Sequence, residues 1–159
     1  LDATSAKFNP GVNHFNDTYP TSTVFSYGGY LGDDLSNDDK VAYCFHSVEG
    51  FSKVGSYVAN GNADGTFVYT GFRPAWVIFK NATSTEAWSI FDSARDPFND
   101  GASQMLLASS SAVEASGSNN VDFLSNGFKP RTTNNPNTSG QTYIYLAFAE
   151  APFKFANAR

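Results

Sequence analysis

The chain has 159 residues, of which 41% are hydrophobic and 16% are charged, and its formal net charge is −5 at pH 7. This composition can fill an apolar core, so it excludes an intrinsically disordered chain. The ten Lys and Arg residues are spread thinly, which argues against a nucleic-acid partner. No apolar run reaches the roughly 18 residues that a membrane helix needs, which argues against membrane insertion.

Short runs rich in Val, Ile, Thr, Tyr and Phe recur along the chain and predict strands. Polar turns with glycine separate them, and the glycines at 61, 65, 127 and 140 are expected to allow a positive φ. Residues 142–149 are apolar on both faces, which predicts a central strand covered on each side. The predicted fold is therefore all-β, an antiparallel, jelly-roll-like β-sandwich. The predicted strands cover residues 23–27, 40–48, 53–58, 66–70, 75–80, 87–92, 105–108, 120–124, 128–131 and 142–149.

The end of the chain resembles its beginning. The strand-loop-strand pattern of residues 25–47 recurs at residues 124–150, with a longer loop in the second occurrence. We therefore predict a partial first module at residues 1–52 and a complete sandwich module at residues 53–159. The edges of the partial module must be covered by the second module or, as we favour, by a neighbouring subunit, which predicts a homo-oligomer.

One segment resembles part of a calcium-binding loop. Asn60, Asn62 and Asp64 supply alternating oxygens, but the twelfth position is Gly71, where a bidentate Glu is required. A tight turn explains the same residues, so no metal site is predicted and the three residues are only an alternative. We find no cofactor motif and no catalytic constellation, so no enzyme is predicted. The single Cys44 is expected to be a buried small hydrophobe.

Aromatic side chains are the more serious binding candidates. Sugar rings stack on exposed Trp and Tyr side chains, while neighbouring Asn and Asp groups bind the hydroxyls. Two tyrosines flank the glycine pair at 28–29, where the chain is expected to form an exposed loop. The predicted carbohydrate-binding residues are Tyr19, Tyr27, Tyr30 and Trp88.

Several longer strings carry a family resemblance. They are residues 41–57, 60–61, 64–77, 91–96, 122–129 and 143–150. Together they resemble an uncharacterised module that is repeated in tandem in virion proteins of tailed bacteriophages, notably marine and cyanobacterial ones. The resemblance implies a virion appendage, fibre or decoration, and it carries no catalytic residues. The short first copy departs from the complete modules of tandem relatives.

We therefore predict a structural virion component at the virion surface, in an extracellular setting, that assembles through β-strand edges and contacts the host. Its predicted partners are further copies of itself or other virion proteins, with Val41, Tyr43 and Phe45 as the assembly residues. The alternative is a lectin-like carbohydrate-binding module for host attachment, with a host-surface glycan as ligand.

Overall fold

In a computed structural model of the chain, the residues that the structure describes are 4–7, 18–26, 42–101, 103–117 and 120–152. The chain divides into two units, one formed by residues 1–6 and 45–159 and the other by residues 7–44. The described residues form no helix, and they therefore contain no helix that could cross a membrane.

The described residues of the unit at 7–44 form no strand. Over its described residues, 23–26, the strand predicted at residues 23–27 is replaced by a turn, in which the Thr21 hydroxyl accepts a hydrogen bond from the Val24 N–H at 3.0 Å. Local side-chain bonds of this kind compete with a strand ladder. The strand predicted at 40–48 is likewise not formed over residues 42–47, and only Val48 makes an isolated bridge, to Ser52.

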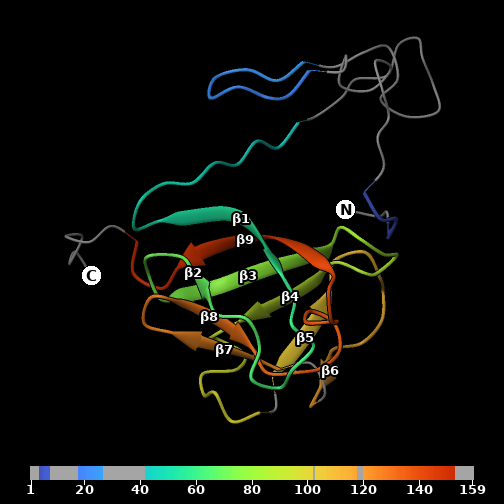
Figure 1. Cartoon of the computed structure of the whole chain (residues 1–159). Coiled ribbons are helices and arrows are strands. Elements are labelled where there is room, and N and C mark those ends of the chain that lie inside the picture. Colours follow the sequence, from blue (N-terminus) through green and yellow to red (C-terminus); the bar gives the residue numbers. More distant parts are fainter. Residues whose placement is uncertain (1–3, 8–17, 27–41, 102, 118–119, 153–159) are drawn as a thin grey trace. The chain divides into compact units, whose positions relative to one another are not determined.

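The other unit is an antiparallel β-sandwich (Figure 1), as the sequence predicts. Its larger sheet has six strands in the order β1-β9-β3-β4-β5-β6, and its smaller sheet has three in the order β2-β8-β7. The strands are β1 (Ser52–Val58), β2 (Val68–Tyr69), β3 (Pro74–Asn81), β4 (Ser89–Asp92), β5 (Gln104–Leu107), β6 (Ala115–Ser116), β7 (Val121–Leu124), β8 (Gly127–Pro130) and β9 (Thr142–Ala149).

Strand β9 is central, as predicted, but its second face is only partly covered, because Ile144 is 42% exposed. It pairs with β1 on one side and with β3 on the other, and its bounds are those predicted from the sequence. The strand predicted at residues 105–108 is formed as β5, one residue earlier in the chain. The two-residue β6 that pairs with β5 was not predicted from the sequence.

The core lies between the two sheets and is mainly aromatic. Phe128 of β8 is fully buried and points toward the larger sheet, where its ring meets Phe79 and Tyr145 edge-on, with centroids 5.1 Å away in each case. Tyr57 stacks on Tyr143 at 5.5 Å. Perpendicular and offset ring pairs of this kind contribute beyond simple area burial. The aromatic residues of the core are therefore supplied by β1, β3, β8 and β9, and also by β4 and β7, which contribute Phe91 and Phe123.

Two glycines are required for a reason other than the expected one. Gly65 and Gly127 do not have positive φ values, in contrast to Gly61 and Gly140. A Cβ atom at Gly127 would lie 2.1 Å from the Val68 carbonyl oxygen, and one at Gly65 would lie 2.1 Å from the Pro130 carbonyl oxygen. These positions therefore need glycine because another backbone segment approaches closely.

Candidate functional site

The predicted sugar-binding residues are not gathered by the described structure. Tyr19 is 92% exposed and belongs to the unit at 7–44, whereas Tyr27 and Tyr30 lie outside the described residues. Trp88 belongs to the sandwich, just before β4, and is half-buried. Its backbone N–H donates to the Ser109 hydroxyl at 3.2 Å. Their role in sugar binding stays a prediction.

The predicted assembly residues lie in the segment that precedes β1. Val41 is outside the described residues, and Tyr43 is exposed. Phe45 is also exposed, but its ring meets Phe148 of β9 edge-on with centroids 6.3 Å apart. Cys44 is exposed, so the prediction of a buried thiol was wrong. The reason is that residues 42–47 form no strand, and so have no sheet face on which to bury it.

The loop that resembles half a calcium site is held together by its own hydrogen bonds. The Asn60 side-chain oxygen accepts from the Asn62 N–H at 3.0 Å, and the Asn62 oxygen accepts from the Asp64 N–H at 2.8 Å. The Asp64 carboxylate pairs with Lys129 at 2.5 Å and with Arg131 at 2.7 Å. Hydrogen bonding to Lys129 is the main cause that lowers the pKa of Asp64. No group of three or more His, Cys, Asp or Glu that could hold a metal occurs among the described residues.

Asn137 fixes this loop from the interior. Its side chain is fully buried, and its amide nitrogen lies 2.8 Å from the carbonyl oxygens of both Asn62 and Thr132. The same nitrogen is 3.0 Å from the Asn60 side-chain oxygen. Asn137 also begins an Asn-Thr-Ser triplet, which fits the sequence pattern for N-glycosylation. Because its side chain is fully buried, the amide is inaccessible to a glycosylating enzyme in the folded protein.

The outer face of the six-stranded sheet carries a row of aliphatic side chains in register. Val54 of β1 pairs with Leu146 of β9, which pairs with Ile78 of β3. Ile78 pairs in turn with Ile90 of β4, and Ile90 with Leu106 of β5. The row therefore crosses five strands on the face opposite the core. We call it the aliphatic row.

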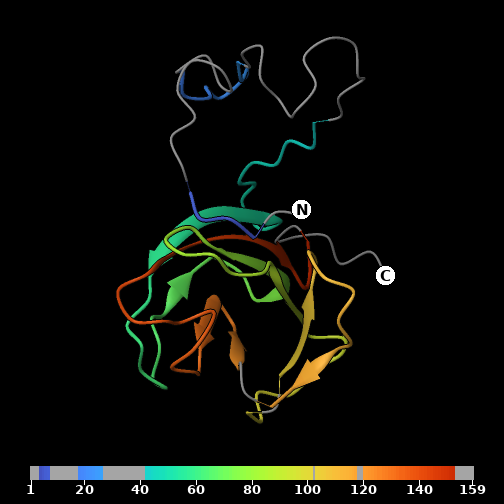
Figure 2. The same cartoon turned by 90° about the vertical axis from the view of Figure 1, so that its right-hand side faces the viewer.

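The aliphatic row is covered in the middle and open toward both ends. Ile78 is buried although it lies outside the core between the sheets, whereas Val54 and Leu106 are exposed. Residues 4–6, dark blue in Figure 2, run along the outer side of this sheet, and the Thr4 carbonyl accepts a hydrogen bond from the Glu86 N–H at 3.0 Å.

Side chains bond outward backbone groups on two of the edge strands, β1 and β7. The Ser47 hydroxyl accepts from the Val54 N–H at 3.1 Å and lies 3.4 Å from the Val54 carbonyl oxygen, on β1. On β7, Ser103 makes the same pair of contacts with Val121, at 3.1 and 3.5 Å. The Asn99 amide group bonds both the N–H and the C=O of Phe123, at 2.9 and 3.1 Å. We call Ser47, Asn99 and Ser103 the edge caps.

Two exposed aromatic rings that the sequence analysis did not single out lie on the smaller sheet. Phe67 is 46% exposed and Tyr69 of β2 is 63% exposed. The Phe67 ring occupies the space that a side chain at Gly127 would take, with ring atoms 3.0 and 3.1 Å from an ideal Cβ position. The contact of the Phe67 ring with Gly127 joins two segments far apart in the chain, so no local sequence signal reports it.

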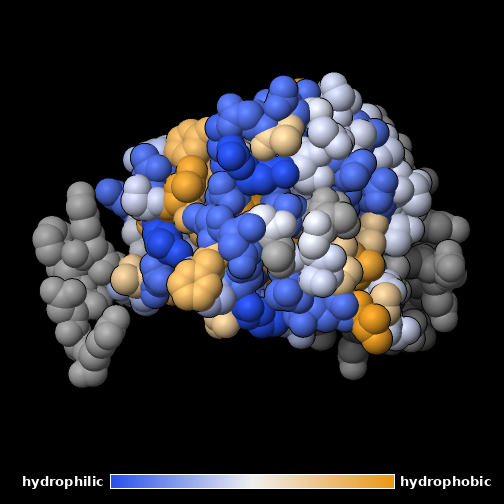
Figure 3. Space-filling model, turned by 90° about the horizontal axis from the view of Figure 1, so that it is seen from below, coloured by the Kyte–Doolittle hydropathy of each residue, from blue (hydrophilic) through white to orange (hydrophobic). Residues whose placement is uncertain are grey.

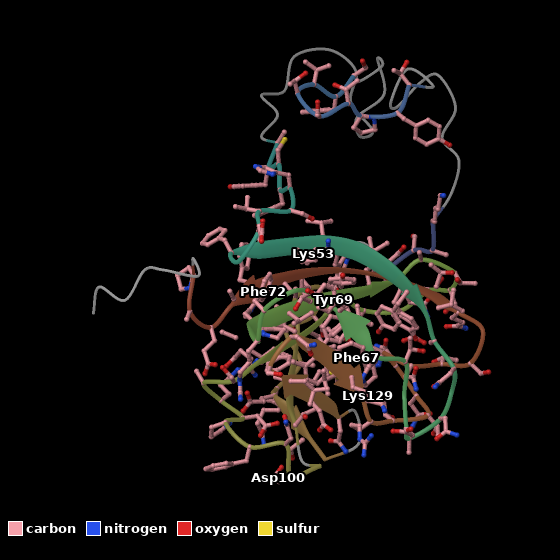
Figure 4. All side chains as sticks on the ribbon, turned by 60° about the vertical axis from the view of Figure 1, so that its left-hand side comes forward. Lys53, Phe67, Tyr69, Phe72, Asp100 and Lys129 are labelled. Atoms are coloured by element: carbon pink, nitrogen blue, oxygen red, sulfur yellow. The ribbon has the colours of Figure 1, made fainter. Side chains whose placement is uncertain are left out.

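A balanced network of charges borders these rings. Lys129 and Arg131 both contact the Asp64 carboxylate, and Arg131 also contacts Asp122 at 3.3 Å. Partial burial is the main cause that raises the pKa of Asp122. Figure 4 shows Phe67, Tyr69 and Lys129 on one side of the molecule, with Lys53 of β1 above them.

Comparison with known proteins gives a family match. The chain matches a family described as "Domain of unknown function (DUF7483)" over residues 1–152, a range that includes parts of both units. No curated protein and no solved structure matches the chain. Because the match covers nearly all of its length, the chain belongs to the DUF7483 domain family.

Proposed function

We propose that this chain is a structural module of a tailed-bacteriophage virion appendage, and that it packs against a second copy of itself through the aliphatic row. The row is the observation that carries the packing between copies, whereas the virion role is supported by the resemblance of strings such as residues 41–57 and 64–77 to the phage module. An antiparallel sheet with one face in water normally alternates apolar and polar residues. Here the second face is aliphatic across five strands, from Val54 to Leu106.

The exposed part of this face suits a contact between copies. Next to the row, the same face carries two further exposed aliphatic side chains, Val58, which is 60% exposed, and Ile144, and Val54 at the end of the row is exposed as well. Burying such aliphatic side chains completely would contribute about 1 kcal/mol or more for each. A copy of the module is the favoured occupant because the sequence pattern of residues 25–47 recurs at 124–150, which is typical of repeated modules that stack on one another.

The edge caps favour packing through a face over pairing through strand edges. A strand edge recruits another strand with its unpaired N–H and C=O groups. On β1 and β7, the outward groups of Val54, Val121 and Phe123 are already bonded by side chains. Assembly through the edges of β1 or β7 would have to displace these bonds.

Self-association can be tested with charges placed on the open part of the face. We expect the parent chain to sediment as an oligomer and the double variant Val58→Lys with Ile144→Lys to sediment as a monomer. The matched control is Val113→Lys, in the exposed loop between β5 and β6. A parent chain that stays monomeric at high concentration, or a double variant that associates like the parent, would contradict packing through this face.

The virion role needs a separate experiment. Antibodies raised against this chain and coupled to gold should label purified particles of the phage that encodes it, at the tail or another appendage. Particles that contain no trace of the chain by mass spectrometry would overturn the virion role. They would leave the sedimentation result unaffected, because self-association does not depend on the particle.

A further inference from the structure

We propose that the outer face of the smaller sheet binds a neutral hexopyranose of a polysaccharide, which stacks on Tyr69 and Phe67. This site is distinct from the residues predicted from the sequence, and it does not rest on the proposed assembly role. The aliphatic row lies on the other sheet, so both surfaces are available at the same time.

Each of the two aromatic rings lies close to a glycine. The Phe67 ring takes the space above Gly127, and the Tyr69 hydroxyl lies 3.6 Å from an ideal Cβ at Gly71. A ring that rests on a glycine is held close to the backbone and loses little freedom when a ligand covers it. Stacking on such a ring therefore costs less ordering entropy than stacking on a freely rotating side chain.

The arrangement of apolar and polar groups fits a sugar better than a purely apolar partner. Figure 3, which views the molecule from below, shows hydrophobic side chains separated by hydrophilic ones. A pyranose presents C–H groups on its faces and hydroxyl groups around its rim, so it needs a ring surface bordered by hydrogen-bonding groups.

The charges next to the rings select a neutral sugar. Lys129 and Arg131 are balanced by Asp64 and Asp122 through contacts of 2.5 to 3.3 Å. The network therefore offers both donors and acceptors that are already fixed in position, which suits neighbouring hydroxyls of one sugar ring. An anionic sugar would meet the Asp64 carboxylate, which is strongly exposed.

The test uses isothermal titration calorimetry with a panel of neutral hexaoses, namely cellohexaose, laminarihexaose, maltohexaose and mannohexaose. We expect saturable binding of at least one, weakened about tenfold by Tyr69→Ala, a loss worth about 1.4 kcal/mol. Tyr69→Phe keeps the ring and should bind like the parent. Phe98→Ala removes another strongly exposed aromatic ring and is the matched control.

Three results would overturn the proposal. The first is that no hexaose binds at millimolar concentration. The second is that binding survives Tyr69→Ala and Phe67→Ala but is lost with Tyr19→Ala, which would locate the site in the other unit. The third is that only an anionic oligosaccharide such as hexagalacturonate binds, with a strong dependence on salt. Because Tyr69 is mostly exposed, Tyr69→Ala should leave the far-UV spectrum unchanged.

Discussion

The edge caps Ser103 and Asn99 are expected to contribute different amounts to the free energy of unfolding. Ser103 is buried, so in Ser103→Ala water cannot easily replace the hydroxyl that bonds both backbone groups of Val121. Two hydrogen bonds at about 1 kcal/mol each give an expected loss of about 2 kcal/mol. Asn99 is exposed, and water can partly replace its two bonds to Phe123, so Asn99→Ala should cost about 1 kcal/mol.

Urea unfolding followed by tryptophan fluorescence measures both losses, provided that the slope of the transition is unchanged. Ser111→Ala, in an exposed loop, is the control and should change stability by less than about 0.5 kcal/mol. The double variant Ser103→Ala with Asn99→Ala should also form larger species than the parent in light scattering, because the β7 edge is then open. A Ser103→Ala variant as stable as the Ser111→Ala control would refute the reasoning, and so would an Asn99→Ala loss larger than that of Ser103→Ala.

Two further predictions concern buried polar groups. Asn137→Ala should lower the free energy of unfolding by about 3 kcal/mol in thermal denaturation, because the Asn137 amide donates to three oxygen acceptors. Asn134→Ala, at an exposed position, is the control. Equal melting temperatures of the two variants would contradict this role of Asn137. Burial, and then the charge of Tyr143, raise the pKa of Tyr57 well above 10.0. The unfolded chain therefore loses this proton first as pH rises above about 10, and stability falls in that range. Tyr57→Phe removes the hydrogen bond from the Tyr57 hydroxyl to the Pro136 carbonyl oxygen and should lower the free energy of unfolding by about 1 to 2 kcal/mol at pH 7. The difference in stability between the variant and the parent should narrow above pH 10. A difference that stays constant with pH would count against the raised pKa.

Much of the sandwich could be predicted from the sequence, because alternation of side chains along a strand is a local property. Strand β9 is the clearest case, since apolar residues on both faces of 142–149 indicated a central position, and β9 does lie between β1 and β3. The residues at 40–48 were likewise predicted as a strand, yet the described part, 42–47, forms no strand. Composition alone cannot supply the neighbouring strand that a ladder requires.

The candidate surfaces were decided by contacts between residues far apart in the chain. Ser103 caps Val121, and the Phe67 ring rests on Gly127, although no local pattern marks either pair. The sequence by itself determined the all-β class and the positions of the long strands, because these follow from the side chains of each segment. Only the tertiary structure decided which edge strands are bonded by side chains, which glycines are approached closely by another backbone segment and which aromatic rings remain exposed. These three properties depend on the packing of one strand against another.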